Sequence, residues 1–110
     1  MRFWDSSALV QLYVEQRYSA ALRKLYLKEP RIAVWWGTQT ECVRAFCRLC
    51  REGRFGKHNA EAERTRDSIL GLFGNDWRNW VEIEPTEQLR KSANALVENH
   101  PEVHLIVLLI

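Results

Sequence analysis

The sequence predicts an α/β fold in which helices cover a short parallel sheet. Three segments, residues 3–4, 32–36 and 81–84, have the composition or the alternation typical of strands, and stretches with helical periodicity separate them. Strands joined through helices run parallel, and those helices bury the faces of the sheet. A chain of 110 residues with 46% hydrophobic side chains can bury one such core, so we expect a single domain over residues 1–110.

The first strand leads directly into two helices. Ser6 or Ser7 can cap a helix that contains the apolar residues between positions 8 and 14. A second helix over residues 18–26 is indicated by apolar side chains spaced three and four residues apart, and Pro30 ends it.

The second strand and the third helix follow. Residues 32–36 are apolar throughout, so this strand is expected to be buried on both faces, with at least one of its two tryptophans in the core. Thr38 and Glu41 stand at the spacing of a capping box and predict a helix that runs to about Arg51.

The remaining pattern completes the order β-α-α-β-α-α-β-α. A helix is expected between Asn59 and Gly74, and residues 81–84 alternate like a strand that is exposed on one face. Thr86 opens a last helix, and residues 103–110 have the character of a further strand.

Charge and cysteine content exclude several classes of protein. Sixteen Lys and Arg against fourteen Asp and Glu give a net charge of +2, too small by itself to predict binding to nucleic acid or membranes. No secretory signal is recognisable, and the longest apolar run, residues 105–110, is too short to span a bilayer. Three cysteines cannot form a disulfide framework, so we expect a cytoplasmic protein without membrane contact.

Two carboxylates are candidates for a metal site. Asp5 ends the first strand, and Glu41 lies shortly after the end of the second. Ligands of parallel sheets bind beyond the carboxyl ends of the strands, so these two side chains can converge. Oxygen ligands of this type suit Mg²⁺ or Mn²⁺, and such an ion supports hydrolysis of phosphodiester bonds.

Both acids also have a simpler structural explanation. Asp5 can cap the following helix, and Glu41 can be the capping-box partner of Thr38. On a helical wheel, however, Glu41 lies beside Arg44 and Arg48 and away from the apolar face. These arginines are candidates for binding nucleic-acid phosphates, the alternative being a solvated face with an ion pair between Glu41 and Arg44.

Two short motifs resemble the PIN-domain family. They are Asp5-Ser6-Ser7-Ala8-Leu9 directly after the first strand, and Thr38-Gln39-Thr40-Glu41 followed by Arg44-Ala45. Over residues 1–100, the motifs and the order of elements are most similar to the toxin subunits of VapBC toxin–antitoxin modules.

The resemblance implies a PIN-like three-layer fold and an Mg²⁺-dependent endoribonuclease that is inhibited by a cognate antitoxin and is often a homodimer. It implies that Asp5 and Glu41 are catalytic metal ligands, with Mg²⁺ or Mn²⁺ as the cofactor. Ser7 corresponds to the hydroxyl that orders the site. Arg44 and Arg48 are then expected near the phosphates of the RNA substrate.

The C-terminal sequence departs from this family. After His100-Pro101, family members continue with a helix that carries a third acid, but residues 102–110 hold no acid at the matching position. We therefore expect a chain that is truncated or frame-altered after about residue 101 and lacks its last strands, which leaves a sheet edge that favours dimers. The alternative function is a catalytically inactive PIN-like module that binds an antitoxin or RNA.

Three other groups of residues invite a functional explanation. The three cysteines between Cys42 and Cys50 reproduce part of a plant-type ferredoxin pattern, but we expect them to pack in the core because they lie on the apolar side of their helix. The two histidines that flank Glu102 have no reliable ligand geometry. Trp77 and Trp80 are candidates for stacking on RNA bases, although a place in the core is the simpler explanation.

Overall fold

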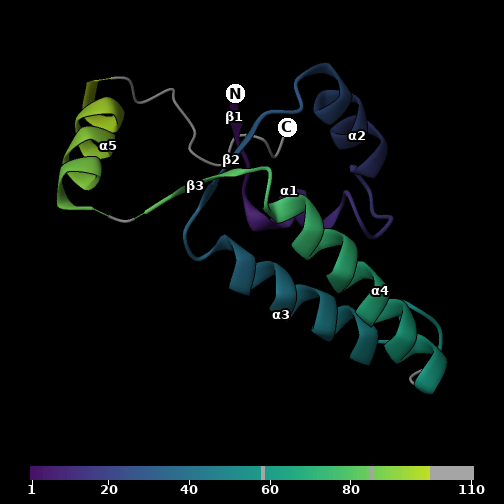
Figure 1. Cartoon of the computed structure of the whole chain (residues 1–110). Coiled ribbons are helices and arrows are strands. Elements are labelled where there is room, and N and C mark those ends of the chain that lie inside the picture. The colour runs from purple at the N-terminus through teal and green to yellow at the C-terminus, as the bar shows by residue number, and fades with distance from the viewer. Residues whose placement is uncertain (58, 85, 100–110) are drawn as a thin grey trace.

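The fold is that of a computed structural model, which describes residues 1–57, 59–84 and 86–99 (Figure 1). These residues form an α/β fold with five helices and one three-stranded parallel sheet. The elements are β1 (Arg2–Phe3), α1 (Ser6–Val10), α2 (Ser19–Lys28), β2 (Ile32–Trp35), α3 (Thr38–Arg51), α4 (Ala60–Trp77), β3 (Val81–Ile83) and α5 (Glu87–Asn99). Their order is the one that the sequence predicts, and the strand expected over residues 103–110 lies outside the described residues.

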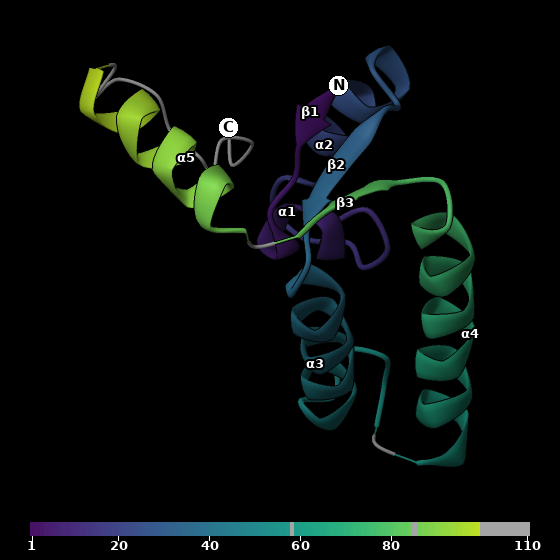
Figure 2. The same cartoon turned by 60° about the vertical axis from the view of Figure 1, so that its left-hand side comes forward.

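The central strand of the sheet is β2, with β1 on one side and β3 on the other, both parallel to it (Figure 2). Arg2 pairs with Ile32 at one end of β2, and Ile83 pairs with Trp35 at the other. Ile32 and its neighbours at positions 33 and 34 are buried, as expected for a covered strand. Because the strands point the same way, the residues that follow β1 and β2 lie at one edge of the sheet.

Helix α1 is shorter than the apolar pattern predicts, because it ends at Val10 while the pattern continues to Val14. The main-chain carbonyl of Gln11 accepts a hydrogen bond from the Ser19 hydroxyl at 2.7 Å, and the side-chain oxygen of Gln11 accepts the N–H of Tyr18 at 2.8 Å. These bonds turn the chain toward α2. The apolar side chains beyond Val10 still pack on the core, which is why their pattern continues past the helix.

Helices α3 and α4 run in opposite directions and close the core with aromatic rings (Figure 2). Phe46 of α3 and Phe73 of α4 meet with ring centroids 5.4 Å apart, and Tyr13 contacts both edge-on. α4 continues beyond Gly74, the end expected from the sequence, to Trp77. The extra turn places Trp77 against Phe73 with centroids 5.5 Å apart.

The tryptophans of β2 differ from the expectation. Trp35 is 38% exposed and Trp36 is 60% exposed, so the prediction that at least one of them lies in the core is wrong. The strand ends at Trp35, and α5 stands apart from the sheet in both views, so it does not bury these rings (Figures 1 and 2). Trp77 and Trp80 instead pack against Phe73 with centroids 5.5 and 6.0 Å away and are partly buried at the edge of the core.

Two predicted helix starts are confirmed by side-chain caps. The Thr86 hydroxyl accepts the N–H of Leu89 at 3.1 Å at the start of α5. The Asn59 side chain accepts the N–H groups of Glu61 and Ala62 at the start of α4. Within the part of the chain that the structure describes, no helix combines the length and apolar character needed to cross a membrane.

Phe73 contacts four aromatic rings, so loss of its side chain should strongly lower the stability of the fold. Phe73 is 1% exposed, and we expect Phe73→Ala to lower the free energy of unfolding by about 3–5 kcal/mol through lost burial and a cavity. Leu72, its neighbour on the same helix, is 62% exposed, and Leu72→Ala should change stability by less than about 0.5 kcal/mol. Urea denaturation measures both, and Phe73→Leu gives a milder variant. Equal losses at positions 72 and 73 would contradict the observed packing.

Candidate functional site

Asp5 follows β1 and caps α1. Its Oδ2 atom accepts the main-chain N–H of Ser7 at 3.1 Å and the Ser7 hydroxyl at 2.7 Å. The cap is therefore Asp5, and the prediction of Ser6 or Ser7 in that role is wrong, because the extended backbone of Asp5 places its carboxylate over the first N–H groups of the helix. The cap engages one carboxylate oxygen, while Oδ1 makes no hydrogen bond or ion pair with a described residue.

Glu41 lies in the first turn of α3 and has no capping role. The N-cap is Gly37, and no side chain caps this helix, so the capping box predicted for Thr38 and Glu41 is not formed. The main-chain N–H of Glu41 donates to the Gly37 carbonyl at 3.3 Å, while its carboxylate is exposed. That carboxylate pairs neither with Arg44 nor with any other described residue. The capping box and the ion pair with Arg44 are therefore not formed, while the exposure of Glu41 agrees with a solvated helix face.

The buried thiol of Cys42 lies where α3 packs against α1. Cys42 is fully buried, and its Sγ atom lies 3.9 Å from the main-chain oxygen of Ser6, where α1 packs against α3. The pKa of this thiol is raised to about 12, mainly by burial and then by the negative charges of Glu41 and Asp5. Asp5 precedes Ser6 and Glu41 precedes Cys42 in the chain, so this contact brings the two positions close to one another.

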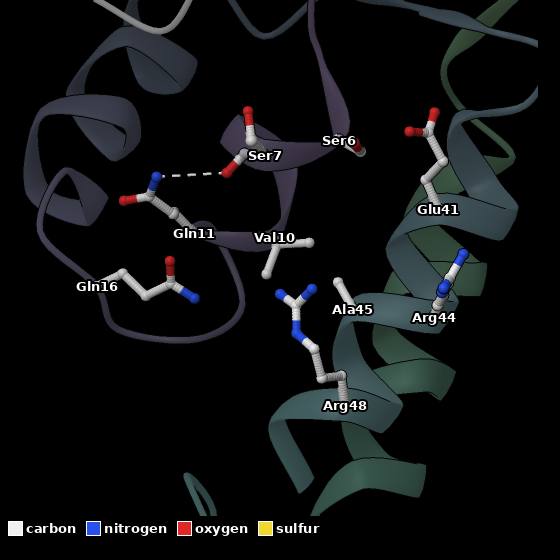
Figure 3. Close-up of a pocket in the computed structure, with 9 residues that line it drawn as sticks. All are labelled: Ser6, Ser7, Val10, Gln11, Gln16, Glu41, Arg44, Ala45 and Arg48. Atoms are coloured by element: carbon white, nitrogen blue, oxygen red, sulfur yellow. Dashed lines mark hydrogen bonds between the residues drawn. The ribbon is translucent and has the colours of Figure 1, made fainter. Parts of the chain in front are cut away.

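An open pocket of about 410 Å³ lies between α1, the loop after it, and α3 (Figure 3). Its lining residues are Ser6, Ser7, Val10, Gln11, Gln16, Glu41, Arg44, Ala45 and Arg48. Four of the predicted site residues are thus brought together on one pocket. Asp5 is not part of the lining, but it is hydrogen-bonded to Ser7, which is.

The basic side chains of the pocket come from α3. Arg44 and Arg48 are both exposed, and in Figure 3 the guanidinium of Arg48 extends across the pocket toward α1. Its Nε atom lies 3.7 Å from a carboxylate oxygen of Glu52. An exposed ion pair of this kind contributes at most about 1 kcal/mol, so the guanidinium is free to exchange Glu52 for a phosphate.

Within residues 1–57, 59–84 and 86–99, no group of three or more His, Cys, Asp or Glu side chains is placed to hold a metal ion. The described part of the site therefore offers two carboxylates. Cys42 and Cys50 are buried, as expected for core packing, whereas Cys47 is half-buried. The histidines that flank Glu102 lie outside the described residues.

No protein-family model matches this sequence, and no curated protein matches it. The chemistry of the site therefore rests on the residues of this chain. Sequence reasoning missed Gln11 and Gln16, which line the pocket opposite α3. Gln11 carried a signal, because it is a polar residue inside the apolar run over residues 8–14. Gln16 lies in the loop before α2, where no pattern points to it.

Two substitutions of Asp5 distinguish its role as the N-cap of α1 from the role of its negative charge. Asn caps helices as well as Asp does, so Asp5→Asn should leave the free energy of unfolding nearly unchanged, whereas Asp5→Ala should lower it by about 1 kcal/mol. Urea denaturation of the two variants checks this difference. Equal destabilisation by Asn and Ala would show that the cap is not the main structural function of Asp5.

The raised pKa of Cys42 predicts how stability depends on pH. The native state keeps this proton up to about pH 12, whereas an unfolded cysteine loses it near pH 9, so stability falls as pH rises above about 9. The contribution is at most about 1.4 kcal/mol per pH unit. We expect Cys42→Ala to be less stable at neutral pH but to lose stability less steeply between about pH 9 and pH 10.5 in urea denaturation. Parallel curves for the two proteins would contradict the prediction.

Proposed function

We propose that this chain is a PIN-type endoribonuclease that uses Mg²⁺ or Mn²⁺ to hydrolyse RNA. The observation that carries the proposal is the environment of Glu41, an exposed carboxylate that pairs with no described residue and shares a pocket with Arg44 and Arg48. Asp5 is hydrogen-bonded to Ser7, which lines the same pocket. A pair of acids beside a pair of arginines matches the needs of a phosphodiester substrate, because anionic oxygens bind the metal and guanidinium groups bind phosphate.

The donor atoms fit one hard divalent cation. Mg²⁺ is commonly bound by one or two carboxylates and keeps several waters or substrate oxygens in its other positions. Oδ1 of Asp5 and the carboxylate of Glu41 are not engaged by described residues, so both can serve as ligands. When bound, the ion supplies charge stabilisation at the phosphate and a lowered pKa for its water.

The other side chains of the site have positioning and binding roles. Ser7 donates to Oδ2 of Asp5 through both its N–H and its hydroxyl, which holds the carboxylate in one orientation and leaves Oδ1 without a hydrogen bond to a described residue. Arg48 extends over the pocket and, together with Arg44, binds phosphates of the RNA backbone (Figure 3).

The resemblance to toxin subunits extends the proposal to two protein partners. A cognate antitoxin would inhibit the enzyme, and a second copy of the chain would form a homodimer in the cytoplasm. A second candidate function is a module that binds RNA or an antitoxin without cleaving RNA. The ligand count favours it, because the described residues supply two carboxylates, whereas a two-metal site needs more.

Cleavage of a panel of single-stranded and structured RNAs tests the proposal. With Mg²⁺ or Mn²⁺ the wild-type chain should cleave RNA, and EDTA should abolish cleavage. Asp5→Asn and Glu41→Gln should reduce cleavage to background because each removes a metal ligand. Ser7→Ala should lower the rate about 10- to 100-fold, as expected for a residue that orients a ligand. Glu61→Gln, an exposed acid at the start of α4, serves as the matched control and should have full activity.

Metal binding provides a readout that is independent of catalysis. Mn²⁺ should raise the melting temperature of the wild-type chain, because a ligand of the native state stabilises it, and it should not do so for Glu41→Gln. A folded wild-type chain that is as inactive as Asp5→Asn with both metals would overturn the endoribonuclease proposal. RNA binding by that inactive chain would then establish the second candidate function.

A further inference from the structure

Two of the three cysteines form a pair near the end of α3. Cys47 and Cys50 are three residues apart in the helix, so their side chains lie one turn apart on one face. Cys47 is half-buried, whereas Cys50 is fully buried, with its Sγ atom 3.7 Å from the main-chain oxygen of Ala62 in α4. The proposed function uses neither thiol, and core packing explains Cys50 better than Cys47.

A guanidinium group from α4 lies on the same side of α3 as the cysteine pair. Ala62 and Arg66 are four residues apart, so Arg66 lies on the face of α4 that contacts Cys50. Because α3 and α4 run in opposite directions, the step from Ala62 to Arg66 leads back along α3 toward Cys47 (Figure 2). The side chain of Arg66 is partly buried, and its Nη2 atom lies 3.1 Å from Oδ1 of Asp67.

Electrostatics agrees with this placement. The pKa of Arg66 is raised first by its hydrogen bond to Asp67, and the charges of Cys47 and Cys50 raise it further. Thiol oxidation proceeds through the thiolate, and reactive cysteines are typical of electropositive, partly accessible surroundings. Cys47 has such surroundings, and Cys50 lies behind it as a second sulfur.

The spacing of the two cysteines permits a covalent bond between them. Cα atoms three residues apart in a helix are about 5 Å apart, which is within the range of disulfides. Their Cβ atoms are about 5–6 Å apart and must approach by about 1–2 Å. Cys50 is the residue before the last of α3, so this movement requires only the final turn of the helix to deform. A bond formed under such strain is readily reduced again.

We propose that Cys47 and Cys50 are a reversible oxidation site, at which a hydroperoxide converts the two thiols into a disulfide within α3. The thiolate of Cys47 attacks hydrogen peroxide, the O–O bond breaks, hydroxide leaves, and Cys47 becomes a sulfenic acid. The sulfur of Cys50 then displaces the hydroxyl group, which leaves as water with the proton of the Cys50 thiol. Two thiols are oxidised and one peroxide is reduced to two waters. A dithiol reverses the bond by thiol–disulfide exchange.

The bond lies in the turn that carries Arg48, a side chain of the pocket. This turn is closed by main-chain hydrogen bonds, from the N–H of Glu52 to the oxygen of Arg48 at 2.9 Å and from the N–H of Gly53 to the oxygen of Cys50 at 3.1 Å. Approach of the two Cβ atoms deforms this turn and displaces Arg48. The oxidation itself is independent of the proposed function, whereas its effect on RNA cleavage rests on that function.

Peptide mapping tests the bond without any measurement of activity. The full chain is treated with hydrogen peroxide, blocked with N-ethylmaleimide in urea and digested with trypsin, which cleaves after arginine and places each cysteine in a separate peptide. We expect the peptides of residues 45–48 and 49–51 to be joined until dithiothreitol is added, and Cys42 to carry the maleimide. Cys50→Ser should stop at the sulfenic acid, which dimedone traps at Cys47. Cys42→Ala is the matched control and should still form the bond.

The rate of bond formation tests the role of the guanidinium group. Arg66→Gln should slow it about 3- to 10-fold, because the positive charge beside the pair is lost. Arg64→Gln removes an exposed arginine from the same helix and should leave the rate unchanged. Equal rates for the two variants would overturn the role of Arg66.

The outcomes separate this inference from the endoribonuclease proposal. Thiols at positions 47 and 50 that stay reduced in peroxide, or bonds that include Cys42, would overturn the inference even where the wild type cleaves RNA. A bond between Cys47 and Cys50 in a chain that cleaves no RNA would support the inference and refute the proposed function. In an active chain, peroxide should lower cleavage in the wild type but not in Cys47→Ser, and full activity of the oxidised wild type would overturn the effect on Arg48.

Discussion

The parallel pairing of β1 with β2 is the constraint on which the candidate site depends. The N–H of Trp4 donates to the carbonyl of Ala33 at 2.9 Å, which fixes the end of β1 against the middle of β2. Asp5 follows Trp4 at once, and the chain enters α3 shortly after β2 ends. Main-chain hydrogen bonds and the buried indole of Trp4 therefore set the positions from which both acids project, and no long loop intervenes.

The side chain of Asp5 caps α1 and is also a candidate metal ligand. The short helix α1 needs an acceptor at its start, and Oδ2 provides it to the N–H of Ser7. The proposed metal site needs a charged oxygen atom, which Oδ1 would provide. A carboxylate satisfies both demands at once because its oxygens point in different directions. Glu41 has no such second task, since Gly37 starts α3 without a side-chain cap.

The sequence predicts the order of elements because the signals for it are local. Helix α3, for example, has its apolar residues at helical spacing and ends before Gly53, whose φ of 80° suits glycine. Features that depend on distant partners were not predictable. The pairing of Trp36 with Ile83 of β3 and the packing of Trp77 and Trp80 on Phe73 of α4 are such features. The contact between Ser6 and Cys42, which brings the chain positions of both acids together, was predicted only as far as parallel strands imply it.

The hydroxyl of Ser19 stabilises the wall of the pocket that contains Gln11 and Gln16. It donates to the carbonyl of Gln11 at 2.7 Å and accepts the N–H of Gln16 at 2.8 Å, while fully buried. Both glutamines line the pocket, and they belong to α1 and its loop rather than to the sheet. The two walls of the pocket are therefore stabilised by separate sets of hydrogen bonds, one within residues 11–19 and one within α3. Amide hydrogen exchange at residues 11–19 reports on the first set independently of the second.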